Sequence, residues 1–268
     1  MALTLGPRAR AAGYGINAFD HIGSTNAEAL TAARGGLDQP TWFVTTEQTA
    51  GRGRRQRVWI APRGNLASSI LEVLDVAPAQ AATLGFAAGL ALVEALRQVS
   101  VEAAVRSGTA VDYSLKWPND VLANRQKLSG ILLEAEATRD GRLAVVVGMG
   151  TNVIAAPEGT PYPAVSLHAL GVDVSAEDLF SALSDRWADL FAIWDRGRGF
   201  GDIRNRWLAC AAGRGEVVSI QTGSGAVSGV FETMDDAGCL VIALAGGGRE
   251  TIAAGDVYFG DVASARPA

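Results

Sequence analysis

The sequence predicts an α+β fold, in which a mixed, largely antiparallel sheet with helices packed on one side is followed by a small β-barrel. Two patterns support this prediction. Up to about residue 212, strand-like segments outnumber the simple strand–helix–strand units of a doubly wound fold. After residue 213, short strand-like segments follow one another through glycine-rich turns with no helix between them. We therefore expect two domains, residues 1–212 and residues 213–268.

Length and composition are those of a globular protein. The 268 residues are 49% hydrophobic and 19% charged, enough to bury one substantial core and a smaller second unit. The formal net charge of −5 weakens a general nucleic-acid-binding function, which more often goes with a basic chain. Two cysteines, Cys210 and Cys239, imply no disulfide framework and fit a cytoplasmic protein with reduced thiols.

No targeting or membrane segment is expected. The first ten residues contain arginines without a following apolar run, which argues against a signal peptide. The apolar stretch at residues 84–93 is too short for a membrane span and is interrupted by glycine. It fits a buried helix better.

The first quarter of the chain predicts a strand, a helix and a second strand. Residues 11–20 offer apolar positions for the first strand. Thr25 and Glu28 form a T-x-x-E capping box, which predicts a helix to about Ala33 with Thr25 as its N-cap. β-Branched and aromatic residues at 41–46 predict a strand that leads into a run of arginines.

The middle of the chain predicts a long buried helix among strands. Pro78 suits a first helical turn, and residues 81–99 keep apolar side chains on nearly every side of the helix. Asn124-Arg125-Gln126 predicts a hairpin turn. The strands expected here are residues 66–73, 111–117, 121–123, 127–136 and 143–147.

The last third of the chain changes from helices to short strands. Ser175 begins a helix that runs to about Trp194, and residues 200–211 form the last expected helix. The strands expected in the β-barrel are residues 216–220, 227–233, 239–244 and 250–253.

Residues 51–59, called here the arginine loop, concentrate positive charge in a short segment. Four arginines and two glycines fall within seven residues, and Trp59 follows closely. Guanidinium groups match phosphate and carboxylate oxygens, and glycine lets the backbone approach a ligand. These residue types suggest a loop that closes over an anionic, ring-bearing small molecule. A solvated basic loop and a nucleic-acid patch are the alternatives.

Four further features contain residues suited to chemistry. S-T-N at residues 24–26 places polar side chains beside the free N–H groups of a helix N-terminus. K-W-P-N-D at 116–120 is an ordinary turn composition, yet its lysine and aspartate are also suited to a triphosphate and magnesium. Lys127 is either a solvated edge residue or a point charge at a pocket mouth. G-x-G-x-N at 148–152 ends a strand with two glycines and is weak evidence alone.

Taken together and in this order, the motifs resemble those of the biotin–protein ligases. The resemblance covers nearly everything after about residue 15, including the small C-terminal β-domain. The family most often has glycine where this chain has Gln56, a departure that leaves the four arginines in place. The motifs are S-T-N at 24–26, E-Q-T-A-G-R-G-R-R-x-R-x-W at 47–59, K-W-P-N-D at 116–120, K-L-S-G-I-L-x-E at 127–134 and G-x-G-x-N at 148–152.

The resemblance implies a two-step ligase with a class II synthetase-like catalytic domain and an SH3-like barrel. Such enzymes activate biotin with ATP, in the presence of Mg²⁺, as biotinyl-5′-AMP. They then transfer biotin to one lysine of a biotin carboxyl carrier protein. The ligase motifs begin near residue 24, which implies the monofunctional form with no DNA-binding domain. A mixed sheet with exposed edges allows a homodimer without requiring one.

The resemblance also implies roles for individual residues. Arg54 and Lys127 would be catalytic, and Asp120 would bind magnesium or orient the incoming amine. The biotin site would comprise Ser24, Thr25, Asn26, Gln48, Arg52, Gly53, Arg54, Lys127, Gly130, Gly148 and Gly150. The nucleotide site would comprise Arg55, Arg57, Trp59, Lys116, Asn119, Asp120 and Asn152.

Two rival functions are open at this point. A lipoate or octanoate ligase of the same superfamily shares the expected architecture, although G-R-G-R-R followed by K-W-P-N-D and K-L-S-G favours biotin. A nucleic-acid-binding module would use the arginine loop and the barrel. The acidic net charge and the lack of a second basic cluster near the barrel weaken that alternative.

Overall fold

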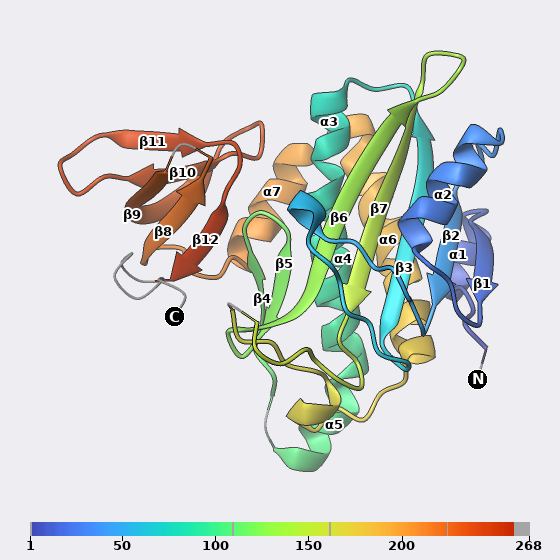
Figure 1. The fold of residues 1–268 in the computed structure, drawn as a ribbon. Coiled ribbons are helices and arrows are strands. Elements are labelled where there is room, and N and C mark those ends of the chain that lie inside the picture. Colours follow the sequence, from blue (N-terminus) through green and yellow to red (C-terminus); the bar gives the residue numbers. More distant parts are fainter. Residues whose placement is uncertain (1, 109, 161, 224, 260–268) are drawn as a thin grey trace.

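The computed structural model describes residues 2–108, 110–160, 162–223 and 225–259 (Figure 1). These residues form a seven-stranded sheet with helices on it, called here the central sheet, and a separate five-stranded C-terminal sheet. The predicted α+β class with a small C-terminal β unit is confirmed.

The central sheet is mixed and largely antiparallel, as predicted. Its strand order is β1-β2-β3-β7-β6-β5-β4. β1 pairs with β2 in parallel, and the other neighbouring strands pair antiparallel. The strands are β1 (Gly15–Phe19), β2 (Thr41–Thr45), β3 (Leu66–Leu74), β4 (Tyr113–Lys116), β5 (Asp120–Ala123), β6 (Gln126–Ala137) and β7 (Leu143–Thr151).

Helices cover both faces of the central sheet, so the expectation of one covered face is wrong. Ile70 on β3 packs into the large core beneath α4 (Leu84–Val99) and α6 (Ala176–Trp194). Its neighbour Leu71 packs with α2 (Thr25–Arg34) in a second apolar cluster. Successive strand residues point to opposite faces, and β3 has large apolar side chains on both faces, so each face needs a cover. Figure 1 shows α2 on one side of the sheet and α4 and α6 on the other.

The remaining helices are short or peripheral. α3 (Pro78–Ala82) leads directly into α4, and α7 (Phe200–Ala209) packs against α4 and α6. α1 (Pro7–Ala11) and α5 (Val101–Ser107) were not predicted. Residues Pro78–Val99 have the length and apolar composition of a membrane span. However, 72% of the apolar 18-residue stretch within this segment is buried inside the protein. The segment comprises the short helix α3 and the buried core helix α4.

The predicted hairpin turn at residues 124–126 is present and aligns two charged side chains. Asn124 and Arg125 both have positive φ, which is the backbone of a tight two-residue β-turn. The β5–β6 pairing shifts register between Val121 and Leu122. This irregularity and the turn bring Asp120 at the start of β5 next to Lys127 near the start of β6.

The C-terminal sheet is antiparallel and attaches to the central body through both apolar packing and polar contacts. The indole N–H of Trp117 donates to the Gly238 carbonyl at 3.0 Å, and Arg125 pairs with Glu216. The last strand, β12, was not predicted. In the order β11-β10-β9-β8-β12, the strands are β8 (Val217–Thr222), β9 (Gly225–Met234), β10 (Leu240–Ala243), β11 (Arg249–Ile252) and β12 (Asp256–Phe259).

A buried carboxyl group lies in the core between β3 and α6. Glu72 is 2% exposed and accepts a hydrogen bond from the Trp187 indole N–H at 3.1 Å. Burial raises the pKa of Glu72 to about 8, and burial beside Glu72 also raises the pKa of Tyr14. The folded protein therefore holds a proton on Glu72 at neutral pH that the unfolded chain releases.

We predict that this proton makes stability fall as pH rises. The folded pKa lies above the ordinary value of 4.5, so the native state binds more protons between pH 4.5 and about 8. Glu72→Gln keeps the acceptor for Trp187 but cannot ionise. Its unfolding temperature should equal or exceed that of the parent protein at pH 8.5 and change less between pH 6 and 8.5. If the stability of Glu72→Gln and that of the parent protein changed equally with pH, in urea or thermal unfolding, this assignment would be wrong.

Candidate functional site

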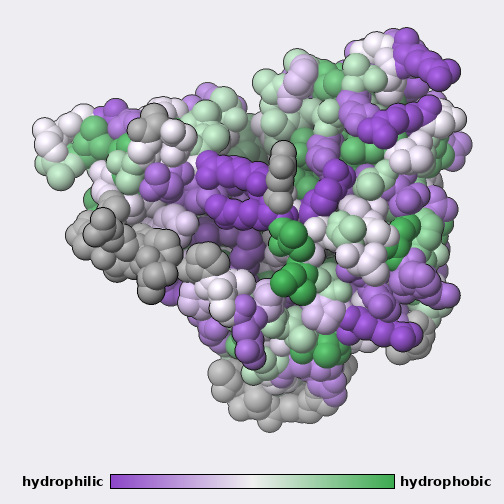
Figure 2. All heavy atoms as spheres, in the orientation of Figure 1, coloured by the Kyte–Doolittle hydropathy of each residue, from purple (hydrophilic) through white to green (hydrophobic). Residues whose placement is uncertain are grey.

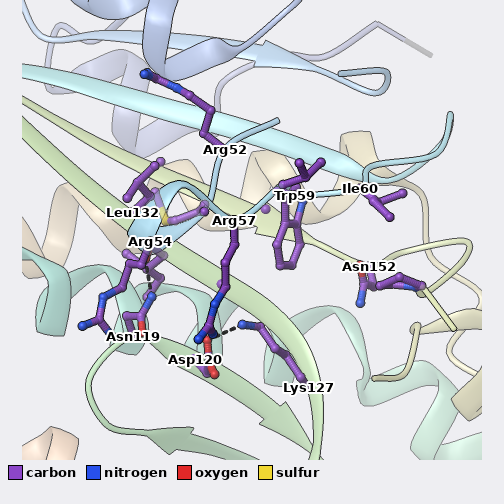
Figure 3. A pocket seen from close by; sticks show the side chains of 18 of the residues that line it. Arg52, Arg54, Arg57, Trp59, Ile60, Asn119, Asp120, Lys127, Leu132 and Asn152 are labelled. Atoms are coloured by element: carbon purple, nitrogen blue, oxygen red, sulfur yellow. Dashed lines mark hydrogen bonds and ion pairs between the residues drawn. The ribbon is translucent and has the colours of Figure 1, made fainter. Parts of the chain in front are cut away.

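A cavity of about 300 Å³ opens on the α2 face of the central sheet (Figure 3). Strands β6 and β7 form its floor, the arginine loop and the start of α2 form its walls, and β12 closes one side. All the residues predicted to form the site line this cavity except Arg55. Those that line it are Ser24, Thr25, Asn26, Gln48, Arg52, Gly53, Arg54, Arg57, Trp59, Lys116, Asn119, Asp120, Lys127, Gly130, Gly148, Gly150 and Asn152.

One end of the cavity is lined by the uncharged polar side chains of Thr25, Asn26 and Gln48. The Thr25 backbone N–H donates to Gln48 Oε1 at 2.9 Å. Ser69 Oγ donates to Asn26 Oδ1 at 2.6 Å and lies 2.7 Å from Thr25 Oγ1. Asn26 Nδ2 donates to Glu134 Oε2 at 2.9 Å. These contacts fix buried donors and acceptors in place, which a ligand needs for specific recognition.

Ser24, and not Thr25, caps α2. Ser24 has extended backbone angles and its side chain accepts from the Ala27 N–H, whereas Thr25 is the first helical residue. The T-x-x-E pattern therefore misplaced the cap by one residue. As a result, the Thr25 hydroxyl is turned toward Gln48 and Ser69 at the cavity.

Glycines in the floor make room for other side chains. A Cβ atom on Gly150 would lie 2.4 Å from the Trp59 indole nitrogen, and one on Gly148 would lie 2.0 Å from Asn26 Oδ1. A Cβ atom on Gly130 would lie 3.2 Å from the Trp59 ring. The glycines thus let Trp59 lie close over β6 and β7, as Figure 3 shows.

The opposite end of the cavity carries positive charge around one carboxylate. Lys127 Nζ lies 2.6 Å from Asp120 Oδ1, and Lys116 Nζ lies 3.1 Å from Asp120 Oδ2. Burial alone would raise the pKa of Asp120, but the two ammonium groups hold it below its usual value. Asp120 is therefore ionised and keeps both lysines directed at the cavity.

The arginine loop folds back on itself as a short hairpin. The Trp59 N–H donates to the Gly51 carbonyl at 2.9 Å, and Gly53 N–H donates to the Arg57 carbonyl at 2.8 Å. A Cβ on Gly51 would lie 2.3 Å from the Trp59 carbonyl oxygen, so this close approach needs glycine. The tip is a single 3₁₀ turn, Arg54–Gln56.

The four arginines of the loop contact three partners. Arg52 points away from Asp120 and Lys127 and pairs with Glu134 at 2.9 Å (Figure 3). Arg54 donates to Asn119 Oδ1 at 3.0 Å, and burial lowers its pKa. Arg55 and Arg57 both pair with Asp256 of β12, at 3.0 and 2.8 Å.

The charges that line the cavity leave a local positive excess. Arg52, Arg54, Arg57, Lys116 and Lys127 are cationic, and Asp120 and Asp256 are the acidic lining residues. Five positive and two negative groups give a surplus of three, in a chain of net charge −5. Hydrophilic side chains gather where the C-terminal sheet meets the central body (Figure 2). This end of the cavity suits a polyanion.

The residues present do not themselves form a magnesium site. Within the described part of the chain, no group of three or more His, Cys, Asp and Glu side chains is placed to hold a metal ion. Both oxygens of Asp120 contact lysines, and Asp256 is engaged by two arginines. Mg²⁺ commonly takes phosphate oxygens and water besides one or two carboxylates, so it would enter with a nucleotide.

Asn152 offers an unused acceptor at the cavity wall. Its Nδ2 donates to the Val165 carbonyl at 3.2 Å, whereas its buried Oδ1 has no hydrogen-bond partner. Buried acceptors are nearly always satisfied, so this oxygen indicates a donor on the ligand.

Sequence reasoning missed several residues of the cavity region, including four that carry polar groups. Ser69 was hidden within an expected apolar strand, although two adjacent serines in a buried strand are a usable signal. Tyr162 lies in an irregular proline-rich stretch, and Lys116 Nζ sits 4.2 Å from the centre of its ring. Asp256 and Tyr258 line the cavity from β12. No local motif marks them, because their position depends on how the C-terminal sheet docks.

Comparison with known proteins agrees with this geometry. The biotin/lipoate A/B protein ligase family model matches residues 21–152, and the biotin protein ligase C-terminal domain model matches residues 215–260. The chain is 40% identical over 243 residues to a biotin–[acetyl-CoA-carboxylase] ligase of Paracoccus denitrificans, covering 88% of this chain and 97% of that protein. The corresponding ligase of Mycobacterium tuberculosis is 35% identical, with 92% and 90% covered.

A solved structure has the same fold. The biotin protein ligase from Aquifex aeolicus in complex with biotin and ATP aligns with a TM-score of 0.73 and 24% identity, covering 91% of this chain and 97% of that one. With the matches to both family models and the extended identity to the two curated ligases, these findings show that the chain belongs to the biotin protein ligase family.

Proposed function

We propose that the protein joins biotin to a lysine of a biotin carboxyl carrier protein at the expense of ATP. The observation that carries this proposal is the division of one cavity into a neutral polar end and a cationic end, where four basic and two acidic side chains leave a surplus of two positive charges. A small substrate with a polar ring and a carboxylate fits across that division, with its carboxylate toward the lysines. The family membership supports the same reaction.

The neutral end suits the ring system of biotin. Its ureido group has both N–H donors and a carbonyl acceptor, which match the fixed hydroxyl and amide groups of Thr25, Asn26, Gln48 and Ser69. Gly148 and Gly150 leave the backbone of β7 open beneath the ring. No charged partner is needed there, because the ring is uncharged.

The cationic end suits the phosphates of ATP. Arg54, Arg57, Lys116 and Lys127 line it together, and their guanidinium and ammonium groups match phosphate oxygens. The free Oδ1 of Asn152 would accept an N–H such as the exocyclic amine of adenine. Trp59 presents a flat ring between the two ends, with Lys127 Nζ 5.7 Å from its centre.

The reaction proceeds in two steps, activation of biotin and its transfer to the carrier. A carboxylate oxygen of biotin attacks the α-phosphorus, the bond to the bridging oxygen breaks, and pyrophosphate leaves. The amine of the carrier lysine then attacks the acyl carbon, and AMP leaves as the amine loses a proton. In the first step two anions must meet, so the task of the protein is to align them and stabilise negative charge. Lys127, at the cationic end and beside the Trp59 ring, would stabilise that negative charge.

The proposal extends to domains, location and partners. Residues 1–212 would form the catalytic domain and residues 213–268 the smaller β domain. A cytoplasmic location and the absence of a DNA partner fit two free cysteines and the net charge of −5. The homodimer stays a prediction from the sequence.

Carrier labelling tests the proposal directly. Purified protein, biotin, MgATP and an apo carrier domain of a biotin-dependent carboxylase are incubated and read by avidin blot. We expect one labelled band that needs ATP and disappears when the acceptor lysine of the carrier is replaced by arginine. Absence of label on the intact carrier would overturn the proposed function.

We predict that Lys127→Ala disables the first step. Removing one group that stabilises developing charge typically costs ~100-fold to ~1000-fold in rate. Biotin-dependent pyrophosphate exchange should fall by about that factor, while circular dichroism should show that the variant is still folded. Exchange at the parent rate would remove Lys127 from this step.

We predict that Arg54→Gly lets the intermediate escape. An acyl-adenylate hydrolyses readily, so a loop held over it limits leakage and side reaction. Losing the Arg54–Asn119 contact removes one attachment of the loop. Biotin should then appear on bystander proteins such as serum albumin, measured by avidin blot against the specific carrier signal. Carrier selectivity equal to that of the parent protein would contradict the lid role.

A further inference from the structure

Asp256 on β12 is the one cavity-lining acidic residue supplied by the C-terminal sheet. Its Oδ2 accepts from Arg55 at 3.0 Å and from Arg57 at 2.8 Å. The carboxylate is 19% exposed, whereas the two arginine side chains are 42% and 65% exposed. A shielded anion therefore holds two cations that would otherwise be largely solvated.

The contacts of the arginine loop divide its attachment between two parts of the protein. The base of the loop is held by its own backbone bonds, Arg52 pairs with Glu134, and Arg54 donates to Asn119. Glu134 and Asn119 belong to the central sheet and its connections. The tip, from Arg55 to Arg57, is attached through Asp256 to the C-terminal sheet.

β12 makes further contacts with the same cavity. The Val257 carbonyl lies 3.4 Å from Lys116 Nζ, which donates to it, and Tyr258 lines the cavity. β12 is an edge strand, held by antiparallel pairing with β8. The side chains of Asp256 and Tyr258 thus line the site, Val257 reaches Lys116 through its carbonyl, and Asp256 binds the arginine loop.

From this geometry we infer that Asp256 is a positioning residue that keeps the arginine loop closed over the acyl-adenylate after pyrophosphate has left. The inference rests on the proposed function. Pyrophosphate removes most of the negative charge that the loop arginines would face, and the adenylate keeps a single phosphate. Asp256 belongs to the protein, so it remains as a counter-ion when that charge departs. Arg55 lies outside the cavity lining and Arg57 within it, so one carboxylate ties the outer arginine to the inner one.

Asp256→Asn tests the inference, because it keeps the shape of the side chain and removes its charge. The adenylate is formed on the protein from labelled biotin, MgATP and pyrophosphatase, separated by gel filtration, and its release is followed in a chase of unlabelled biotin. Two partly exposed charge-assisted pairs are lost, so release should be ~10-fold faster. Asp256→Glu should restore retention to within ~2-fold, since the charge is kept.

A matched control is available in the same interface. Arg125 and Glu216 form another arginine–carboxylate pair between the central body and the C-terminal sheet, but neither residue lines the cavity. Glu216→Gln should leave adenylate release unchanged. Raising the salt concentration should speed release from the parent protein more than from Asp256→Asn, because screening acts on the pair that the variant lacks.

The loop side provides an independent variant. Arg55→Gln removes one partner of Asp256 from a position outside the cavity, and it should also speed release. Adding it to Asp256→Asn should cause little further change, because both substitutions break the same contact. Retention in Asp256→Asn equal to the parent, or an equal loss in Glu216→Gln, would overturn the positioning role. Absence of any adenylate on the parent protein would overturn the proposed function itself.

Discussion

The arrangement of the site depends on one constraint: several positively charged side chains must be held close together in one cavity. Five cationic side chains line a space of about 300 Å³, and repulsion among them would open the site without counter-charges. Asp120 bridges the two lysines from within the central sheet, and Asp256 bridges Arg55 and Arg57 from the C-terminal sheet. The remaining excess of positive charge is what a polyanionic substrate would neutralise.

The fold places these two carboxylates for different reasons. Asp120 reaches its position through the tight turn at Asn124 and Arg125 and the irregular β5–β6 register, so its geometry is local. Asp256 reaches its position because a sheet folded from the end of the chain docks beside β4 and β5 through Trp117 and Arg125. The C-terminal sheet is therefore part of the cavity wall as well as part of the large hydrophobic core.

Local patterns in the sequence were sufficient to predict most helices and strands and most of the polar and charged residues that line the cavity. Ser175 and the apolar period after it gave the start of α6, and the motif glycines and lysines converge as expected. Nonlocal packing set the remainder. Strand β12 is four residues long and forms against β8, about 35 residues earlier in the chain, so Asp256 had no local signal. The cap at Ser24 depended on backbone angles that T-x-x-E could not specify.

The central claim is that the two ends of the cavity serve biotin and ATP in a single adenylation reaction. The most direct measurement is the exchange of labelled pyrophosphate into ATP by the purified protein, run with biotin and, in parallel, with lipoate. The account predicts exchange that depends on biotin and is absent with lipoate. Exchange supported by lipoate, or none with biotin, would contradict it.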